Sequence, residues 1–172
     1  MLPKLIITDI DGVWTDGGMY YDNQGGEFKK FNTSDSAGVL LCRQLGIQVA
    51  IITGENTDIV SRRAKKLNID LLFQGVQDKV SCAEEIWNKT GCTPSETAFI
   101  GDDFGDVPLL QKVGFAGCPA NASEYIKKYA HWIGQKKGGD GAFREFVEHI
   151  LITEGLLETT VEQIITKLHA TK

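Results

Sequence analysis

The chain has 172 residues, which is the usual length of one compact domain with little left over. Hydrophobic residues make up 42% of the sequence and charged residues 24%, so a buried core is attainable and wholesale disorder is disfavoured. Eighteen Lys and Arg residues against 23 Asp and Glu residues give a formal net charge of −5, with no long basic run. We therefore expect neither nucleic acid nor an anionic membrane as a partner.

The beginning of the chain and the cysteines indicate the compartment. Only a few apolar positions precede Asp9, which is too few for a signal peptide or a membrane span, so we predict a cytoplasmic protein. Cys42, Cys82, Cys92 and Cys118 are scattered, with no C-x-x-C pair and no His at zinc-site spacing. We interpret them as reduced packing residues.

Apolar runs and amphipathic patterns alternate along the chain. The runs resemble strands buried on both faces and cover residues 5–7, 49–52, 71–73 and 97–100. Helical patterns cover residues 36–45, 56–67, 79–90, 142–150 and 156–168. This alternation predicts an α/β fold, a Rossmann-like doubly wound parallel sheet that binds ligands at the carboxyl ends of its strands. We expect a single domain over residues 1–172, with a C-terminal helical segment over about 142–172.

One segment interrupts the alternation directly after the first strand. Residues 18–21 and 27–31 flank the turn-rich stretch 22–26, which has the sequence Asp-Asn-Gln-Gly-Gly. This pattern is typical of a β-hairpin with a longer loop. We therefore predict a hairpin insertion over about residues 18–31.

Paired carboxylates end the first predicted strand. Asp9 and Asp11 lie two residues apart, and an extended chain points both to the same side. A polar turn explains an isolated pair equally well, because Asp-Gly is common in turns. The fourth predicted strand is followed by three more acids, Asp102, Asp103 and Asp106. Five carboxylates at one sheet edge predict a hard divalent cation, and Mg²⁺ prefers such oxygen ligands.

Two further residues at strand ends suit a phosphate. Thr53 offers a hydroxyl donor and is followed by Gly54, and Lys79 offers a cation. The alternatives are a helix cap for Thr53 and a solvated side chain for Lys79.

Taken in chain order, Asp-x-Asp-Gly-Val, Thr-Gly, Lys and Gly-Asp-Asp-x-x-Asp resemble the haloacid dehalogenase superfamily of phosphotransferases. A signalling receiver domain uses the same residue types in a different order, with its Lys last. The resemblance extends over nearly the whole chain and is strongest in residues 9–17, 31–38, 52–55, 73–75, 101–103 and 138–145. These motifs are similar to the branch that includes 3-deoxy-D-manno-octulosonate 8-phosphate phosphatase and 2-keto-3-deoxy-nononate 9-phosphate phosphatase. The resemblance implies a haloacid dehalogenase-like fold without a cap domain, and homotetramers in which neighbouring subunits close each active site.

The resemblance also implies roles for the acids. Asp9 is the nucleophile that forms an aspartyl phosphate, and Asp11 protonates the leaving sugar oxygen and then activates water. Mg²⁺ is held by Asp9, the backbone carbonyl of Asp11, and Asp102. Asp103 and Asp106 support the metal shell and Lys79, although direct ligation by Asp103 is an equal alternative.

Phosphate and substrate contacts are implied in the same way. Thr53 and Lys79 bind phosphate oxygens. The segment that recognises substrate is Asn32, Thr33, Ser34, Asp35 and Ser36. An N-cap role for Ser34 or Asp35 is equally compatible with this segment.

Departures from the octulosonate enzymes bear on the substrate. Those enzymes have Arg after Thr-Gly and a second Arg in the first helix, where this chain has Glu55 and Leu40. Glu55 can accept hydrogen bonds from hydroxyls of a longer sugar acid. Arg63 and Lys66 lie three apart on a predicted helix and can meet a substrate carboxylate that reaches from a neighbouring phosphate site. The alternative for this pair is a solvated basic face.

We therefore predict an Mg²⁺-dependent phosphatase of 2-keto-3-deoxy-nononate (or sialic acid) 9-phosphate. One alternative is a 3-deoxy-D-manno-octulosonate 8-phosphate phosphatase of lipopolysaccharide biosynthesis. A further alternative is a relative without turnover, which is either a phosphoacceptor or an assembly domain.

Overall fold

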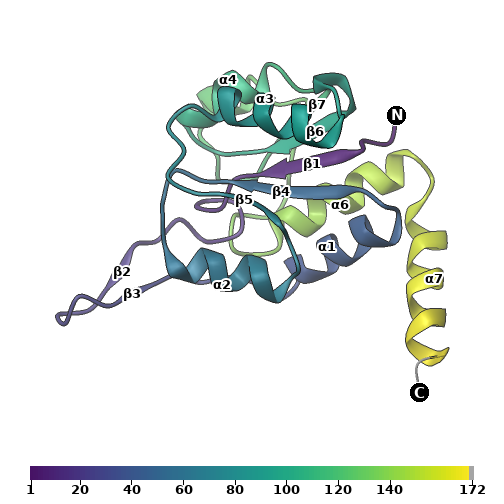
Figure 1. Cartoon of the computed structure of the whole chain (residues 1–172), viewed down its shortest axis with the longest axis horizontal. Helices are drawn as coiled ribbons and strands as arrows, with labels where there is room; N and C mark the ends of the chain where they lie inside the picture. Colours follow the sequence, from purple (N-terminus) through teal and green to yellow (C-terminus); the bar gives the residue numbers. More distant parts are fainter. Residues whose placement is uncertain (171–172) are drawn as a thin grey trace.

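A computed structural model describes residues 1–170 and shows a parallel sheet between two layers of helices (Figure 1). The sheet strands are β1 (Leu5–Thr8), β4 (Gln48–Ile52), β5 (Leu71–Phe73), β6 (Thr97–Ile100), β7 (Phe115–Cys118) and β8 (Trp132–Ile133). The helices are α1 (Asp35–Gln44), α2 (Asp58–Lys66), α3 (Lys79–Thr90), α4 (Val107–Leu110), α5 (Glu124–Lys127), α6 (Ala142–Thr153) and α7 (Leu157–Ala170), with 3₁₀ turns η1 (Pro94–Glu96) and η2 (Phe104–Asp106). The predicted C-terminal helical segment ends at residues 171–172, which lie outside the described residues.

The strand order is β5-β4-β1-β6-β7-β8, and every neighbouring pair is parallel. Alternate side chains of β1 enter different cores, as the period of two along a strand requires. Ile6 joins the core beneath α1, α2 and α6, whereas Leu5 and Ile7 join the core beneath α3, α4 and α5. The predicted doubly wound α/β fold is confirmed, and β1 lies in its middle.

Two strands of this sheet were absent from the sequence prediction. β7 and β8 extend the sheet beyond β6, so the expectation of four strands was too low. β7 reads Phe-Ala-Gly-Cys, without the β-branched residues that mark a strand, and β8 has only two residues. Gly117 of β7 allows the ring of Phe146 to pack closely against this strand, because a Cβ at position 117 would lie 2.5 Å from that ring.

The predicted hairpin follows β1 and projects from the body of the protein (Figure 1). Its paired strands are short, β2 (Tyr20–Tyr21) and β3 (Glu27–Phe28), and they run antiparallel. An isolated bridge between Thr15 and Phe31 closes its base. No larger insertion separates β1 from α1, which agrees with the expected absence of a cap domain.

At the start of α1, neither Ser34 nor Asp35 caps the helix through its side chain, so the alternative of a capping role is wrong. Ser34 is the N-cap residue of α1 but makes no side-chain cap hydrogen bond. The buried carboxylate of Asp35 instead accepts a hydrogen bond from the backbone N–H of Arg144, 3.0 Å away at the start of α6. Asp35 thus joins α1 to α6 and does not cap its own helix.

All four cysteines are buried and free, which confirms their interpretation as packing residues. Among residues 1–170, no helix combines the length and the apolar character that crossing a membrane requires.

Candidate active site

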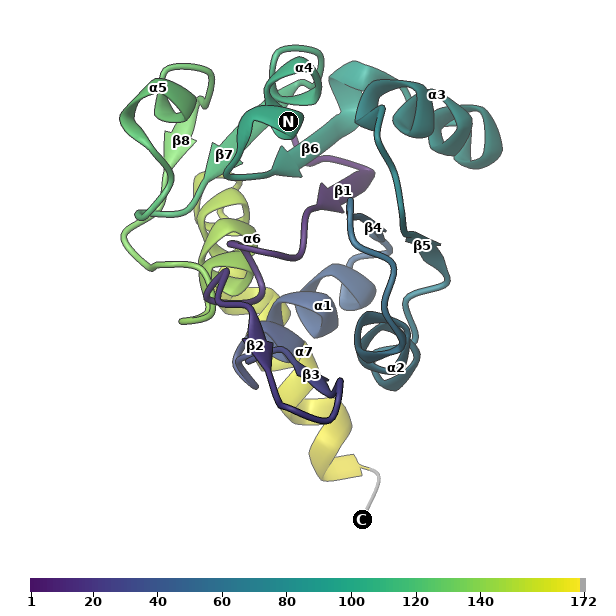
Figure 2. The same ribbon diagram turned by 90° about the vertical axis from the view of Figure 1, so that its left-hand side faces the viewer.

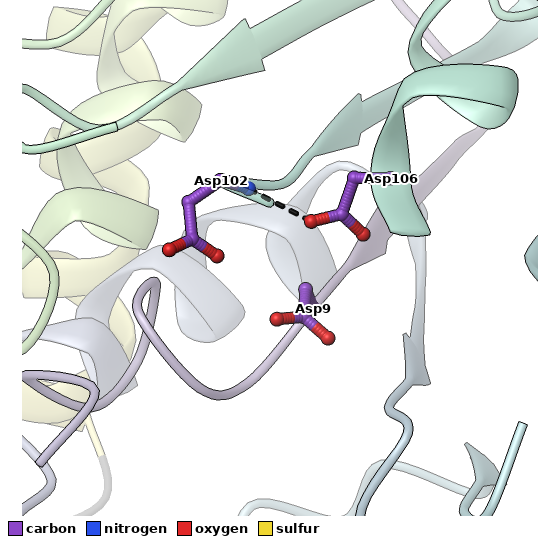
Figure 3. Close-up of side chains that lie close together, drawn as sticks. All are labelled: Asp9, Asp102 and Asp106. Carbon is purple, nitrogen blue, oxygen red and sulfur yellow. Dashed lines mark hydrogen bonds between the residues drawn. The ribbon is translucent and has the colours of Figure 1, made fainter. Parts of the chain in front are cut away.

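Three carboxylates meet at the carboxyl ends of the two central strands. Asp9 follows β1, Asp102 follows β6, and Asp106 ends the turn η2 (Figure 3). The two strands pair in register, with Thr8 opposite Ile100, so the chain that leaves them delivers the acids to one place. One oxygen of each acid lies within 4.8 Å of the others. Of the five carboxylates predicted to converge, Asp9, Asp102 and Asp106 form this cluster, whereas Asp11 and Asp103 do not belong to it.

Lys79 neutralises part of this negative charge. It begins α3, directly after the N-cap residue Asp78, and its side chain is 9% exposed. Its ammonium donates to Asp9 over 2.7 Å and also to Asp106. The alternative of a solvated Lys79 is therefore wrong. A buried ammonium is costly unless it is paired, and this one has two carboxylate partners.

Asp106 also organises the loop that carries Asp102. Its Oδ2 accepts hydrogen bonds from the backbone N–H of Asp102 (2.8 Å) and of Asp103 (3.0 Å). The Asp103 carboxylate accepts from the N–H of Phe104 at 2.7 Å and so caps the turn η2. Asp106 thus supports both Lys79 and the acidic loop, as the family resemblance implied.

Burial and the neighbouring acids raise the pKa values of Asp9 and Asp102. Burial raises the pKa of Asp9 to about 7, with Asp106 adding to the rise and Lys79 opposing it. Burial and the charges of Asp9 and Asp106 raise the pKa of Asp102 to about 8. Burial alone would lower the pKa of Lys79, but its two carboxylate partners outweigh that effect and raise it. The cluster holds more negative charge than one ammonium balances.

The donor set of this cluster fits a hard divalent cation. Oδ1 of Asp102 is buried and has no hydrogen-bond partner, which is costly for a carboxylate oxygen unless a cation faces it. Asp102 approaches the backbone closely at Gly12, where φ is +86° and a Cβ would overlap the carboxylate. Glycine at this position therefore leaves room for the acid.

A cleft of about 290 Å³ connects the cluster with the predicted phosphate-binding residues. Thr53 follows β4, and both Thr53 and Lys79 line the cleft beside Asp9 and Asp11. Glu55, Asp103 and Asp106 contribute to the same lining. The structure thus brings together most of the predicted catalytic, phosphate-binding and metal-supporting residues, although Asp102 belongs to the cluster without lining the cleft.

The segment predicted to recognise substrate follows the hairpin in the chain and does not line this cleft. Asn32 donates its side-chain amide to the carbonyl of Gly139 at 3.1 Å and accepts from the N–H of Ser34 at 2.9 Å. Thr33 is exposed, whereas Ser36 is half-buried. Direct substrate contact by residues 32–36 stays a prediction.

Arg63 is a partner of that segment. Its guanidinium donates to the carbonyl of Asn32 (3.0 Å) and to the hydroxyl of Ser36 (3.2 Å), and it lies over the rings of Trp14 and Phe31. The solvated alternative is therefore wrong for Arg63, although Lys66 is exposed. A contact from either residue to a substrate carboxylate stays a prediction.

Sequence reasoning missed two residues that hold Asp11. Both oxygens of Asp11 accept hydrogen bonds from Lys29 of the hairpin, at 2.7 and 2.8 Å, and Oδ1 also accepts from the hydroxyl of Thr15 at 3.1 Å. Lys29 and Lys30 are adjacent and chemically identical, so the sequence alone did not show which one turns inward. Alternation along a strand indicates that they point oppositely, but only the hairpin register fixes the direction.

Comparisons with known proteins agree with this geometry. A family model described as haloacid dehalogenase-like hydrolase matches residues 52–146. The chain is 39% identical over 155 residues to the 3-deoxy-D-manno-octulosonate 8-phosphate phosphatase of Yersinia pestis, covering 90% of this chain and 83% of that protein. The corresponding enzyme of Haemophilus influenzae is 37% identical, with coverage of 88% and 84%.

A solved structure of the same kind of enzyme is also similar. The crystal structure of the Moraxella catarrhalis 3-deoxy-D-manno-octulosonate 8-phosphate phosphatase, in complex with a magnesium ion, a phosphate ion and a KDO molecule, superposes with a TM-score of 0.90. The two chains are 35% identical, and the match covers 94% of this chain and 93% of the other.

Proposed function

This chain belongs to the haloacid dehalogenase-like hydrolase family and is a phosphoric monoester hydrolase, and from that premise we propose that its substrate is the phosphate ester of a 2-keto-3-deoxy sugar acid. The relatives support 3-deoxy-D-manno-octulosonate 8-phosphate as that ester, which was the alternative in the sequence analysis. They give less support to the nononate 9-phosphate. The observation that carries the proposal is the cleft that joins Asp9, Asp11, Thr53 and Lys79.

The cofactor is Mg²⁺, held by Asp9 and Asp102. Asp106 supports this site by accepting hydrogen bonds from Lys79 and from the backbone N–H of Asp102. The clustered oxygens and the unpartnered Oδ1 of Asp102 support this assignment, as does the magnesium ion bound to the Moraxella catarrhalis relative. When bound, the ion offsets negative charge on the acids and on the phosphate. A ligand role for the backbone carbonyl of Asp11 belongs to the same proposal.

Hydrolysis proceeds in two transfers of the phosphoryl group. An oxygen of Asp9 attacks phosphorus, the bond from phosphorus to the sugar oxygen breaks, and Asp11 gives its proton to that oxygen. Water then attacks the aspartyl phosphate, the bond to Asp9 breaks, and Asp11 takes up the proton of the water. Thr53 and Lys79 hold the phosphate oxygens during both transfers.

Glu55 favours a second candidate substrate, the nine-carbon nononate 9-phosphate. It is exposed and lines the cleft beside Thr53, where a sugar chain bound through its phosphate would pass. A carboxylate at this place accepts hydrogen bonds from sugar hydroxyls and repels the carboxylate of a shorter acid.

Replacing Glu55 with Arg is expected to shift preference toward the eight-carbon ester. A gained or lost charged contact is worth roughly 1.5–3 kcal/mol, so the ratio of kcat/KM for the two esters should change by about tenfold to a hundredfold. Steady-state kinetics on both esters, for wild type and for Glu55→Arg, measures this ratio. Higher kcat/KM of the wild type for octulosonate 8-phosphate supports the main proposal, and the reverse order supports the nononate reading. An unchanged ratio in the variant would show that Glu55 does not select the substrate.

The assembly is a homotetramer in which neighbouring subunits close each site. The hairpin supports this proposal, because Tyr20 (44% exposed), Tyr21 (68%) and Phe28 (58%) form an uncovered aromatic surface on it. Sedimentation equilibrium is expected to give four chains per particle, and replacing Tyr21 and Phe28 with Ser should lower that number. A fully active monomer at micromolar concentration would contradict the proposal.

A further inference from the structure

Lys29 is a buried cation that the hairpin delivers to the catalytic loop. It follows β3, and its side chain is only 1% exposed, although the hairpin projects from the protein in Figure 1 and points toward the viewer in Figure 2. Its ammonium donates to both oxygens of Asp11. Two charge-assisted hydrogen bonds from one ammonium hold the carboxylate of Asp11 in place.

The neighbours of Lys29 leave it few other partners. Among residues 1–170, the nearest other carboxylate is that of Glu27, whose Oε1 lies 3.9 Å from the ammonium and has no hydrogen-bond partner. Thr15 holds Asp11 from another side, and its own hydroxyl oxygen accepts from the backbone N–H of Gly17 at 3.2 Å. Asp11 keeps 25% of its side-chain surface exposed and lines the cleft.

We propose that Lys29 is a positioning residue for Asp11 in proton transfer to the leaving group, an inference that rests on the proposed function. An acid that protonates a leaving oxygen must lie at a fixed place, and small displacements of such groups slow the reaction strongly. The negative charge that forms on Asp11 as its proton departs is formed beside an ammonium, which stabilises it. The hairpin thereby takes part in catalysis through Lys29, which lies 18 residues after Asp11 in the sequence but contacts it directly.

This role predicts a dependence on the leaving group. Asp9, Thr53 and Lys79 contact neither Lys29 nor the leaving oxygen in this scheme, so attack and phosphate binding need no help from the hairpin. A sugar alkoxide leaves poorly without a proton, whereas p-nitrophenolate leaves well without one. Loss of Lys29 should therefore matter for sugar phosphates and matter little for p-nitrophenyl phosphate.

The experiment compares kcat/KM for the two kinds of ester in Lys29→Met, which keeps the length of the side chain and removes its charge. This parameter reports only the steps through formation of the aspartyl phosphate. We expect a loss of about tenfold or more for the sugar-acid phosphate and less than about threefold for p-nitrophenyl phosphate. Lys29→Arg keeps a cation and should recover part of the loss. Lys30→Met is the matched control, because Lys30 is 61% exposed and lies 3.8 Å from Asp16.

Equal losses for both esters would overturn the proposal, because a merely structural lysine affects all substrates alike. Unchanged kinetics for the sugar-acid phosphate in Lys29→Met would also overturn it. If Lys29→Met does not fold, as judged by circular dichroism, the same comparison is made with Lys29→Arg, which alters the contact geometry. A wild type that rejects both sugar-acid phosphates would refute the proposed function instead, and the best alkyl phosphate from a panel then replaces them in the test of Lys29.

Discussion

Replacing Asp9 with Asn is expected to lower kcat by about four orders of magnitude or more, because an amide cannot form the aspartyl phosphate. Asn has nearly the same shape as Asp, so the fold should persist. The side chain of Asp9 is 9% exposed and burial raises the pKa of its carboxyl, so the site already disfavours its charge. We expect the unfolding temperature of the metal-free variant to be no lower than that of the wild type.

Phosphate release on a sugar-acid phosphate and differential scanning calorimetry measure the two effects separately. Asp70→Asn is a suitable control, because Asp70 is exposed and lies at the amino end of β5, whereas the acidic cluster lies at the carboxyl ends of the strands. Turnover by Asp9→Asn at more than a small fraction of the wild-type rate would rule out Asp9 as the nucleophile. A collapse of the fold would show that the charge of Asp9 is needed for stability.

The acidic cluster was predictable because parallel strands constrain where their following residues go. β1 and β6 are neighbours in the sheet, so Asp9 and Asp102 necessarily meet at its edge. Lys79 was predictable for the same reason, since it begins the helix after β5. These inferences needed only strand positions and chain direction.

Residues outside the strand ends were less accessible to sequence reasoning. Arg63 carries a helix-face pattern that is compatible with solvent, yet it packs over Trp14 and Phe31 because the hairpin base folds onto α2. The contact of Lys29 with Asp11 depends on how a hairpin of two-residue strands twists back toward its own base. No local pattern encodes such contacts, because they depend on tertiary packing between segments with separate periodicities.

The electrostatic design of the site links catalysis to stability. Asp9, Asp102 and Asp106 share the positive charge of Lys79, and two of these acids have raised pKa values. Such a cluster lowers the stability of the empty protein and raises its affinity for a cation, as is common where function requires buried charge.

This link predicts that Mg²⁺ stabilises the protein more at about pH 8 than at about pH 6. The folded pKa values of Asp9 and Asp102 are about 7 and about 8, above the ordinary carboxyl value of 3.8. In this window the folded metal-free protein binds more protons than the unfolded chain, so its stability falls as the pH rises. The two raised pKa values together make this fall on the order of 4 kcal/mol. Mg²⁺ must displace these protons at the lower pH, whereas at the higher pH it meets a larger ionised fraction of both acids and relieves their repulsion.

Thermal unfolding in EDTA and in Mg²⁺ at both pH values measures this difference, and turnover should disappear in EDTA. Asp102→Asn removes one titrating acid and its negative charge and replaces one carboxylate oxygen with an amide nitrogen, so we expect it to reduce both the Mg²⁺-induced shift and its pH dependence. Asp70→Asn makes the same chemical change at the exposed amino end of β5 and should behave as the wild type. An equal Mg²⁺-induced shift at both pH values would mean that the bound ion does not compete with protons on Asp9 and Asp102. The cation would then have to be held elsewhere than between the ends of β1 and β6.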